Sequence, residues 1–224
     1  MKELTSELIV DLRGRLDTEL HLILSRSFEM GFLGGMPIDE QVDHALGFVG
    51  LVEAELGRAP QSVIDLGTGG GVPGLVLACC WPDARVVLMD GSEKRITFLS
   101  EAIQQVAGAE HAQVELGRAE ELGHRPDLRE LFEVVTSRSF GSPAVTAECG
   151  SSFAMLGGIM VISEPPESAE TERWPADGLE KVGLVPAGQF RAADRFGYQV
   201  IRKQVALDER YPRRVGVPAK RPLF

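Results

Sequence analysis

The sequence predicts an α/β fold in which a mostly parallel sheet is flanked by helices and preceded by a helical cap. Short apolar runs rich in β-branched residues alternate with helical segments after residue 59, and such runs are typical of parallel strands buried on both faces. The first run is followed by a glycine-rich turn at 67–71, which makes the predicted sheet Rossmann-like. Residues 1–58 show helical periodicity instead, so they are expected to form the cap.

The cap is expected to contain helical stretches separated by a break. Within residues 1–30 leucines recur at every fourth position and form an apolar stripe, which predicts one or two helices. The stripe contains Leu8, Leu12, Leu16, Leu20 and Leu24. Glycines within 31–37 interrupt this pattern, and a further helix is expected to start at Pro37 and to run to about Leu56.

Residues 59–224 are expected to form the sheet and its covering helices. The predicted strands lie at 62–67, 84–90, 112–117, 132–138 and 159–164. The predicted helices lie at 73–80, 94–106 and 144–156, and loops are expected at 119–127 and 165–178. Two closing segments, 179–190 and 198–204, predict an antiparallel pair at the edge of the sheet, and a basic tail is expected from about residue 210.

The composition is that of one large globular domain, or of one domain with an appendage. The chain has 224 residues, of which 44% are hydrophobic and 25% charged, as is ordinary for a soluble protein. The longest apolar run, GLVLACCW, is too short to cross a membrane, and charges interrupt the N-terminal segment, so no secretory signal is expected. The three cysteines lack metal-ligand spacing, so no metal site is expected, and a reducing cytoplasm is the expected location.

The formal net charge of −10 argues against binding of nucleic acid through a broad basic face. The tail is an exception, because residues 210–224 contain five basic residues and no acid. These are Arg210, Arg213, Arg214, Lys220 and Arg221. The tail can contact a phosphate backbone locally, without long-range steering by the whole molecule. We expect Arg213 and Arg214 either to make such contacts or to lie in a solvated strap across the sheet.

The glycine-rich turn and the acids on either side of it predict a cofactor site. The turn matches G-x-G-x-x-G, the fingerprint of dinucleotide sites, but this match is weak in a chain with 25 glycines. Asp65 stands two residues before Gly67, where its charge would repel a pyrophosphate. S-adenosylmethionine carries a sulfonium and an ammonium group, so the same acid would favour it. Asp90, at the end of the next strand, is placed to accept hydrogen bonds from ribose hydroxyls.

The alternative is a turn that binds nothing, in which the two acids serve as helix caps. Ligands of such sheets lie outside the carboxyl ends of the strands, so one crevice is expected to collect the segments found there. They are Asp65, the turn at 67–71, Asp90, the loop at 117–121 and residues 136–140.

Several motifs together resemble one bacterial family. They are DLGTGGGVPG, VVLMDGSEKRITFL, LGRAEEL, VVTSRSF and the C-terminal RYPRRVGVPAKRPL. Over 60–162 and 198–224 the chain is similar to the glucose-inhibited division protein B family, whose members methylate guanine N7 in 16S ribosomal RNA. The resemblance implies a class I methyltransferase fold, S-adenosylmethionine as cofactor, and 16S ribosomal RNA or the small ribosomal subunit as partner.

The resemblance also implies roles for single residues. The residues implied to bind the cofactor are Gly67, Thr68, Gly69, Asp90, Ala119 and Glu120, to which the turn itself adds Asp65 and Gly71. Asp90 would take the ribose hydroxyls, and Ala119 and Glu120 would lie beside the adenine. Arg138 is implied as the catalytic residue, at the floor of the crevice near the transferring methyl group.

Two departures from the family pattern leave the methyl acceptor open. Residues 1–50 lack the family's Trp-Asn…Asn-Leu-Thr signature, and the strand that normally ends in Lys-Gly has Glu164 there instead. A negative charge in place of a cation disfavours a polyanionic substrate. A small-molecule N- or O-methyltransferase that diverged from the family is therefore an alternative to the RNA enzyme. A cofactor-binding scaffold without activity is a third hypothesis.

Guanine N7 carries a lone pair and no proton, so its methylation requires positioning and not a general base. Arg138 is expected to donate to guanine O6 or to a phosphate, or else to pair with Glu120, Glu148 or the cofactor carboxylate. Phe140 is expected either to stack on a base or to belong to the core. Glu164 is expected to accept a hydrogen bond from the substrate or to lie free in solvent.

Overall fold

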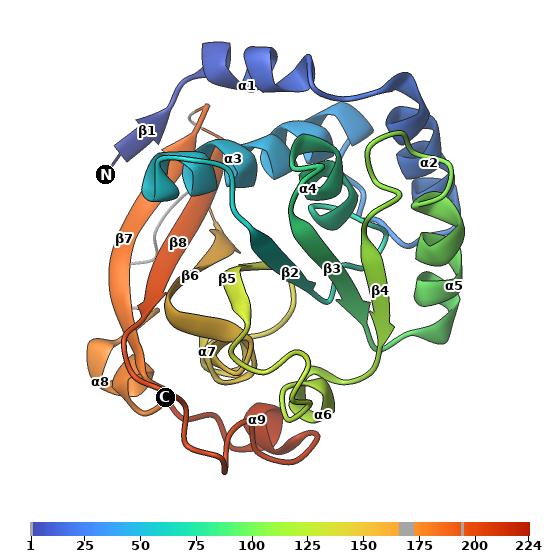
Figure 1. The fold of residues 1–224 in the computed structure, drawn as a ribbon. Coiled ribbons are helices and arrows are strands. Elements are labelled where there is room, and N and C mark those ends of the chain that lie inside the picture. The colour runs from blue at the N-terminus through green and yellow to red at the C-terminus, as the bar shows by residue number, and fades with distance from the viewer. Residues whose placement is uncertain (1, 166–172, 194) are drawn as a thin grey trace.

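The computed structural model describes residues 2–165, 173–193 and 195–224, and Figure 1 shows their arrangement. Within these residues the strands are β1 (Lys2–Leu4), β2 (Ser62–Leu66), β3 (Arg85–Asp90), β4 (Gln113–Leu116), β5 (Phe132–Ser137), β6 (Ala154–Glu164), β7 (Leu184–Ala192) and β8 (Phe196–Lys203). The helices are α1 (Ser6–Arg13), α2 (Thr18–Glu29), α3 (Ile38–Leu56), α4 (Gly74–Cys80), α5 (Glu93–Ala102), α6 (Ala119–Leu122), α7 (Pro143–Ser151), α8 (Ala176–Glu180) and α9 (Val217–Lys220).

The strands form one sheet in the order β1-β7-β8-β6-β5-β2-β3-β4, and β8 runs antiparallel to both of its neighbours. The other strand pairs are parallel, which confirms the predicted mostly parallel sheet flanked by helices. Asp65 at the end of β2 is in register with Leu88 of β3 and Thr136 of β5. The carboxyl ends of the three central strands therefore meet at one edge of the sheet.

The predicted antiparallel pair is confirmed as β7 and β8, but its predicted place at the edge of the sheet is wrong. β8 lies between β6 and β7, and the N-terminal strand β1 pairs with β7 on its outer side. The three residues of β1 were expected to be helical. A strand this short gives no alternating pattern to read, and its partner is about 190 residues away in the sequence.

The helix predicted over 144–156 is too long, since α7 ends at Ser151 and β6 begins at Ala154. Two serines at this end bond to backbone carbonyls and so compete with the helix. The Ser151 hydroxyl donates to the Val182 carbonyl oxygen and the Ser152 hydroxyl to that of Cys149. Short helices also occupy segments predicted to be loops or tail, namely α6, α8 and α9. Residues 166–172 of the predicted loop lie outside the described residues.

Side chains of alternate residues along the strands pack into two hydrophobic cores, one on each face of the sheet. The helices α1 to α5 cover one face, and α6, α7 and α8 cover the other together with the C-terminal segment (Figure 1). Val63 of β2 thus packs in the first core and its neighbour Ile64 in the second. The first three helices share a core with the sheet, so they are fixed in position relative to the strand ends.

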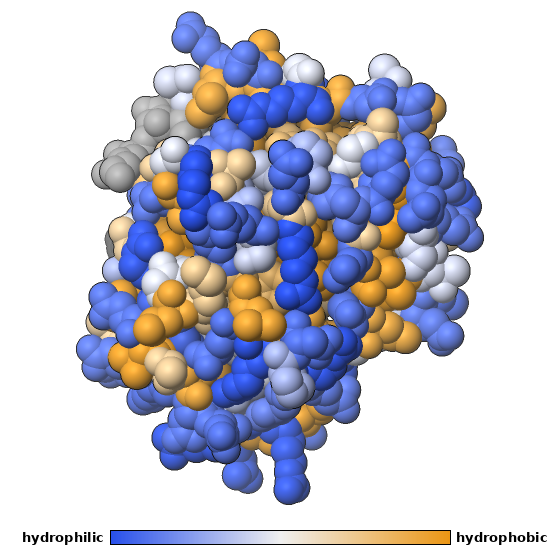
Figure 2. All heavy atoms as spheres, viewed as in Figure 1, coloured by the Kyte–Doolittle hydropathy of each residue, from blue (hydrophilic) through white to orange (hydrophobic). Residues whose placement is uncertain are grey.

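Helix α3 crosses closely over β8 because it has a glycine at the crossing. A Cβ on Gly47 would collide with the ring of Tyr198, whose hydroxyl donates to the His44 carbonyl oxygen at 2.7 Å. Hydrophilic and apolar side chains are interspersed over the face drawn in Figure 2. Among the described residues, no helix is long and apolar enough to span a membrane, and no group of His, Cys, Asp or Glu side chains is arranged to hold a metal ion.

Candidate active site

Two cavities open at the carboxyl ends of the central strands. The glycine-loop cleft has a volume of about 670 Å³, and its lining includes Gly67, Asp90, Arg118, Glu120, Phe140 and Ala219. The arginine pocket has a volume of about 520 Å³, and its lining includes His44, Arg138, Phe140, Glu164, Arg173 and Arg195. Residues 139–141 line both cavities, so the two meet there.

Asp65 supports the glycine-rich turn from inside the protein and lines neither cavity. Its buried carboxylate accepts from Thr136 Oγ1 at 2.7 Å and from the backbone N–H of Gly74 at 3.1 Å. Gly74 begins α4, so the acid meets the positive end of that helix. Burial raises the pKa of Asp65 to about 6, although these hydrogen bonds act in the opposite direction. The acid therefore fixes the shape of the turn.

The turn presents backbone to the glycine-loop cleft. Gly67 has a φ of 62°, and a Cβ there would lie 2.8 Å from Cδ2 of Phe140, so this position requires glycine. Thr68 is buried, and a Cβ on Gly71 would run into Leu75 of the core. Thr68 and Gly71 thus shape the turn from behind, while Gly67 faces the cleft.

Asp90 ends β3 and lines the same cleft. Its carboxylate accepts from the backbone N–H groups of Gly69 at 3.0 Å and Ser92 at 2.8 Å, and Arg95 Nη1 lies 3.4 Å away. A carboxylate has about four acceptor sites, so Asp90 keeps capacity for a ligand hydroxyl after these contacts. The residue both pins the glycine-rich turn and presents an acceptor to the cleft.

The C-terminal segment completes the far wall of the cleft. Glu120 of α6 accepts from the backbone N–H of Gly216 at 3.0 Å, and Arg118 Nε lies 3.6 Å from its carboxylate. Ala219 of α9 belongs to the lining, whereas Ala119 is buried behind Glu120. The structure thus brings Glu120 to the cleft, as predicted, whereas Ala119 packs in the second core.

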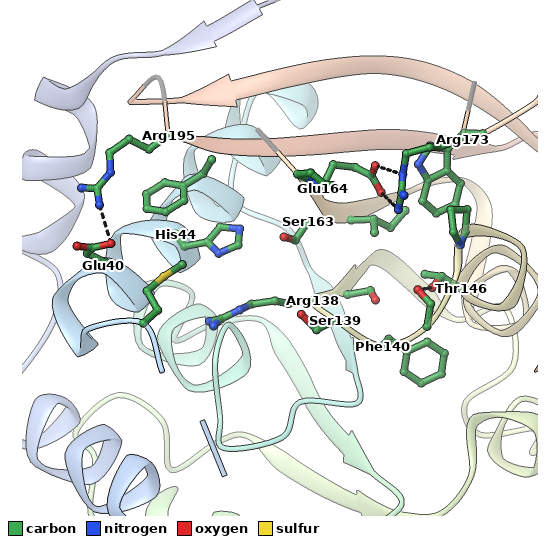
Figure 3. A pocket seen from close by; sticks show the side chains of 18 residues that line it. Glu40, His44, Arg138, Ser139, Phe140, Thr146, Ser163, Glu164, Arg173 and Arg195 are labelled. Atoms are coloured by element: carbon green, nitrogen blue, oxygen red, sulfur yellow. Dashed lines mark hydrogen bonds and ion pairs between the residues drawn. The ribbon is translucent and has the colours of Figure 1, made fainter. Parts of the chain in front are cut away.

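Arg138, directly after β5, extends into the arginine pocket (Figure 3). Its Nη2 donates to Oε1 of Gln41 at 2.9 Å, whereas the buried Nη1 has no hydrogen-bond partner among the described residues. Burial lowers the pKa of Arg138 from its ordinary value, and the nearby Asp65 opposes that change. The guanidinium group therefore has one donor nitrogen held by Gln41 and one that is buried without a partner among the described residues.

His44 of α3 lies beside Arg138 and is not suited to act as a base at neutral pH. Its ring stacks on Phe196 at a centroid distance of 4.8 Å, and neither ring nitrogen has a hydrogen-bond partner in the described part of the chain. Burial, helped by the charge of Arg138, lowers the pKa of His44 to about 3. The imidazole is neutral near pH 7 and offers the pocket an aromatic wall.

Two ion pairs flank the mouth of the arginine pocket (Figure 3). Glu164, at the end of β6, accepts from Arg173 Nε at 2.7 Å, and Glu40 of α3 lies 2.6 Å from Arg195 Nη2. Glu164 is thus neither free in solvent nor unpaired. Each acid cancels one cation, and Arg138 is left as the excess positive charge among the charged residues of the lining.

The chain is similar to proteins whose names describe one activity. The model of the family described as rRNA small subunit methyltransferase G matches residues 43–172. A ribosomal RNA small subunit methyltransferase G from Pelotomaculum thermopropionicum is 38% identical over 72% of this chain and 70% of its own length. The protein of the same name from Symbiobacterium thermophilum is 36% identical over 84% of this chain and 80% of its own length.

The chain belongs to the rRNA small subunit methyltransferase G family. It is therefore an enzyme, a methyltransferase that uses S-adenosylmethionine. Solved structures agree on the fold. A putative O-methyltransferase from Klebsiella pneumoniae superposes with a TM-score of 0.58 at 12% identity, covering 84% of this chain and 91% of that one. An O-methyltransferase from Bacillus cereus in complex with SAH gives 0.57 at 15% identity, over 84% and 91%.

The glycine-loop cleft of this family member fits the cofactor. Its volume suits a ligand of that size. Asp90 offers an acceptor for ribose hydroxyls, and Gly67 lines the cleft with backbone alone. Contacts of Gly67, Gly69, Asp90 and Glu120 with the cofactor stay predictions. For Asp65, Thr68, Gly71 and Ala119 the geometry indicates support of the cleft and not its surface.

The two neighbouring arginines of the tail, Arg213 and Arg214, lie in different environments. Arg213 donates to the fully buried Glu148 through Nε at 2.9 Å and Nη2 at 2.6 Å, and its backbone N–H adds a bond at 2.8 Å. The geometry therefore favours a structural role for Arg213 in holding the C-terminal segment to α7, because a phosphate would have to displace Glu148. Arg214 is exposed, and its side chain makes no hydrogen bond or ion pair with a described residue. Because Glu148 pairs with Arg213, it is not the partner of Arg138.

Sequence reasoning missed several residues of the site. Gln41 lies on the apolar stripe of α3, where a polar residue among buried neighbours signals a hydrogen-bonded role. Ser27 of α2 donates to the Gly70 carbonyl oxygen at 2.9 Å and so ties the cap to the glycine-rich turn. Arg173 and Arg195 give no sequence signal, since isolated arginines in polar segments are ordinary. Their place follows only from the folding of distant segments around one pocket.

Proposed function

We propose that this enzyme transfers a methyl group from S-adenosylmethionine to N7 of a guanine in 16S ribosomal RNA. The observation that carries the proposal is Arg138, which lines a pocket that joins the glycine-loop cleft and whose buried Nη1 has no hydrogen-bond partner among the described residues. The names of the relatives support the same substrate class. A cytoplasmic location accompanies this proposal, because ribosomal RNA is found there.

The pocket suits an acceptor that has a free lone pair. S-adenosylmethionine supplies the electrophilic methyl group, and N7 of guanine needs no deprotonation before attack. His44 is neutral and walled in by aromatic rings, and Arg138 stays charged, so neither is a general base. We infer that Arg138 donates to O6 of the guanine, which lies beside N7 on the same edge of the base. The pocket orients the base and excludes water.

Phe140 lies where the two cavities meet. It is half-buried, packs over Gly67 and lines both cavities. An aromatic ring there is placed to stack on the acceptor base beside the cofactor cleft. The same ring also contacts the second core, so both predicted roles for Phe140 are compatible with its position.

A small-molecule acceptor is the second candidate. The acids Glu40 and Glu164 at the pocket mouth and the net charge of −10 favour it, because they weaken attraction to a polyanion. The pocket volume of about 520 Å³ accommodates a free small molecule as well as a base.

Methyl transfer in vitro separates the two candidates. The purified enzyme is incubated with S-adenosylmethionine labelled in its methyl group and with small ribosomal subunits from cells that lack this gene. The proposal predicts label at N7 of one guanine of 16S ribosomal RNA. Binding of the cofactor without any label in the RNA would contradict it and would favour the small-molecule acceptor.

A further inference from the structure

Gln41 is a fully buried polar side chain at the junction of the helical cap and the arginine pocket. Its side-chain amide makes three hydrogen bonds. Nε2 donates to the carbonyl oxygens of Gly34 at 3.1 Å and Met36 at 2.8 Å, and Oε1 accepts from Arg138 Nη2 at 2.9 Å. Both the NH2 group and the oxygen of this amide are therefore hydrogen-bonded.

These partners fix the direction of the amide. Two backbone carbonyls can only accept hydrogen bonds, so the NH2 group must face them and the oxygen must face Arg138. A buried amide left without partners would be costly, which holds the arrangement in place. The segment before α3 and the arginine after β5 are thereby joined through one side chain.

The consequence for Arg138 is an oriented guanidinium group. Its Nη2 edge is occupied by Gln41, and its Nη1 is buried without a partner among the described residues. Met36, whose carbonyl Gln41 holds, lines the same pocket as Arg138. One neutral side chain thus fixes both the guanidinium group and the position of a pocket wall, and it does so without forming an ion pair with Arg138.

We propose that Gln41 is a positioning residue for methyl transfer, which holds the guanidinium group of Arg138 at the arginine pocket, where it contacts the acceptor base. This inference rests on the proposed function for its kinetic test. Gln41 lines neither the glycine-loop cleft nor the arginine pocket, so it acts through Arg138.

The kinetic test compares Gln41→Leu with Gln199→Leu. Gln199 is also a buried glutamine, whose Nε2 donates to the backbone carbonyls of Gly188 and Val200 in the sheet, and it lines neither cavity. Both variants lose buried amide bonds. Only Gln41→Leu is expected to lower kcat, by roughly 10- to 100-fold, the usual effect of misplacing a group that acts in the transition state. The Kd for S-adenosylmethionine in calorimetry should change less than about twofold.

A double variant shows whether Gln41 acts through Arg138. In an Arg138→Met background, Gln41→Leu should cause no further loss of kcat, because the group that it positions is gone. A wild-type kcat for Gln41→Leu, equal losses in Gln41→Leu and Gln199→Leu, or additive losses in the double variant would each overturn the inference.

A second measurement is independent of activity and needs no Gln41 variant. In protein labelled with ¹⁵N-arginine, the Nη signals of Arg138, assigned by their loss in Arg138→Lys, should be resolved from each other because the bond to Gln41 hinders rotation. One averaged Nη signal in the wild-type protein would overturn the inference. Should ribosomal subunits prove not to be a substrate, this result still shows whether the guanidinium group of Arg138 is held in place, so the two failures are distinguishable.

Discussion

Two buried titratable residues near Arg138, His44 and Asp65, change the stability of the protein in opposite directions as the pH falls. The pKa of His44 lies at about 3 in the folded protein, below its ordinary 6.5, chiefly because of burial. Between these values the unfolded chain binds a proton that the folded protein excludes, so stability falls as the pH drops from 6.5 toward 3. The pKa of Asp65 is raised to about 6, also chiefly by burial. The folded protein binds that proton more readily between pH 3.8 and 6, so Asp65 partly offsets the loss.

His44→Phe should remove the larger of these two effects, the loss of stability at acid pH that is caused by the buried His44. The substitution keeps an aromatic ring against Phe196 while deleting the group that must stay neutral. We expect the decline in the free energy of unfolding between pH 7 and pH 4.5 to be smaller than in the wild type, as measured by urea unfolding at both values. The exposed His21 on α2, changed to Gln, serves as the control and should leave the wild-type decline in place. An unchanged decline in His44→Phe would contradict this explanation.

At the scale of elements, the C-terminal segment is bound to the body of the protein by arginines. Arg129 donates to the carbonyl oxygens of Gly123, Leu207, Asp208 and Tyr211, and Arg213 grips Glu148 of α7. Through Gly216 and α9 the same segment reaches Glu120 and the glycine-loop cleft. A tail that reads in the sequence as a basic strip is therefore partly internal structure, and this reduces the number of cations free for RNA.

Substitutions of the adjacent Arg213 and Arg214 should have different effects, one on stability and the other on binding. Arg213→Met leaves the buried Glu148 without its ion-pair partner, so the free energy of unfolding should fall by about 3–5 kcal/mol. Arg214→Met should change it by less than about 0.5 kcal/mol, since that side chain is exposed. If Arg214 contacts a phosphate, its loss should weaken binding to small subunits and lower the salt dependence by about one charge. Urea unfolding and filter binding measure the two effects, and a reversed pattern would contradict the assignment.

The sequence predicted the parts of this fold that depend on local pattern. The central strands, the glycine-rich turn and Asp90 at the end of β3 follow from apolar runs and spacing, and the structure confirms their positions. Gln41, Arg173 and β1 could not be predicted, because their roles depend on partners from distant segments. Arg138 was found through the family resemblance, but its free Nη1 required the structure.

On the scale of the whole molecule, the proposed RNA substrate must be bound through local cations, because the protein is acidic. The net charge of −10 gives no long-range attraction to RNA, and two of the three arginines in the pocket lining are paired with acids. Release of Arg173 from Glu164 on binding would turn that ion pair into a phosphate contact. The departure from the family's Lys-Gly pattern would then lower the affinity for RNA without removing the cation.

Glu164→Gln tests this account of the charge. Removing the acid frees Arg173, so binding to small ribosomal subunits should tighten by about two- to fivefold at moderate salt, the scale of a partly exposed ion pair. Glu7→Gln on α1, outside both cavity linings, makes the same change in net charge and should have no such effect. Weaker binding in Glu164→Gln would contradict this account, because it would indicate that Glu164 itself contributes to the contact with the ribosomal subunit.

The central claim concerns the methyl acceptor, and 16S ribosomal RNA from cells that lack this gene tests it most directly. Mapping of N7-methylguanine should show one guanine that is unmethylated in these cells. The wild-type gene should restore its methylation, and a gene for a folded Arg138→Met variant should not. Full methylation of 16S ribosomal RNA in the deletion strain would contradict the account.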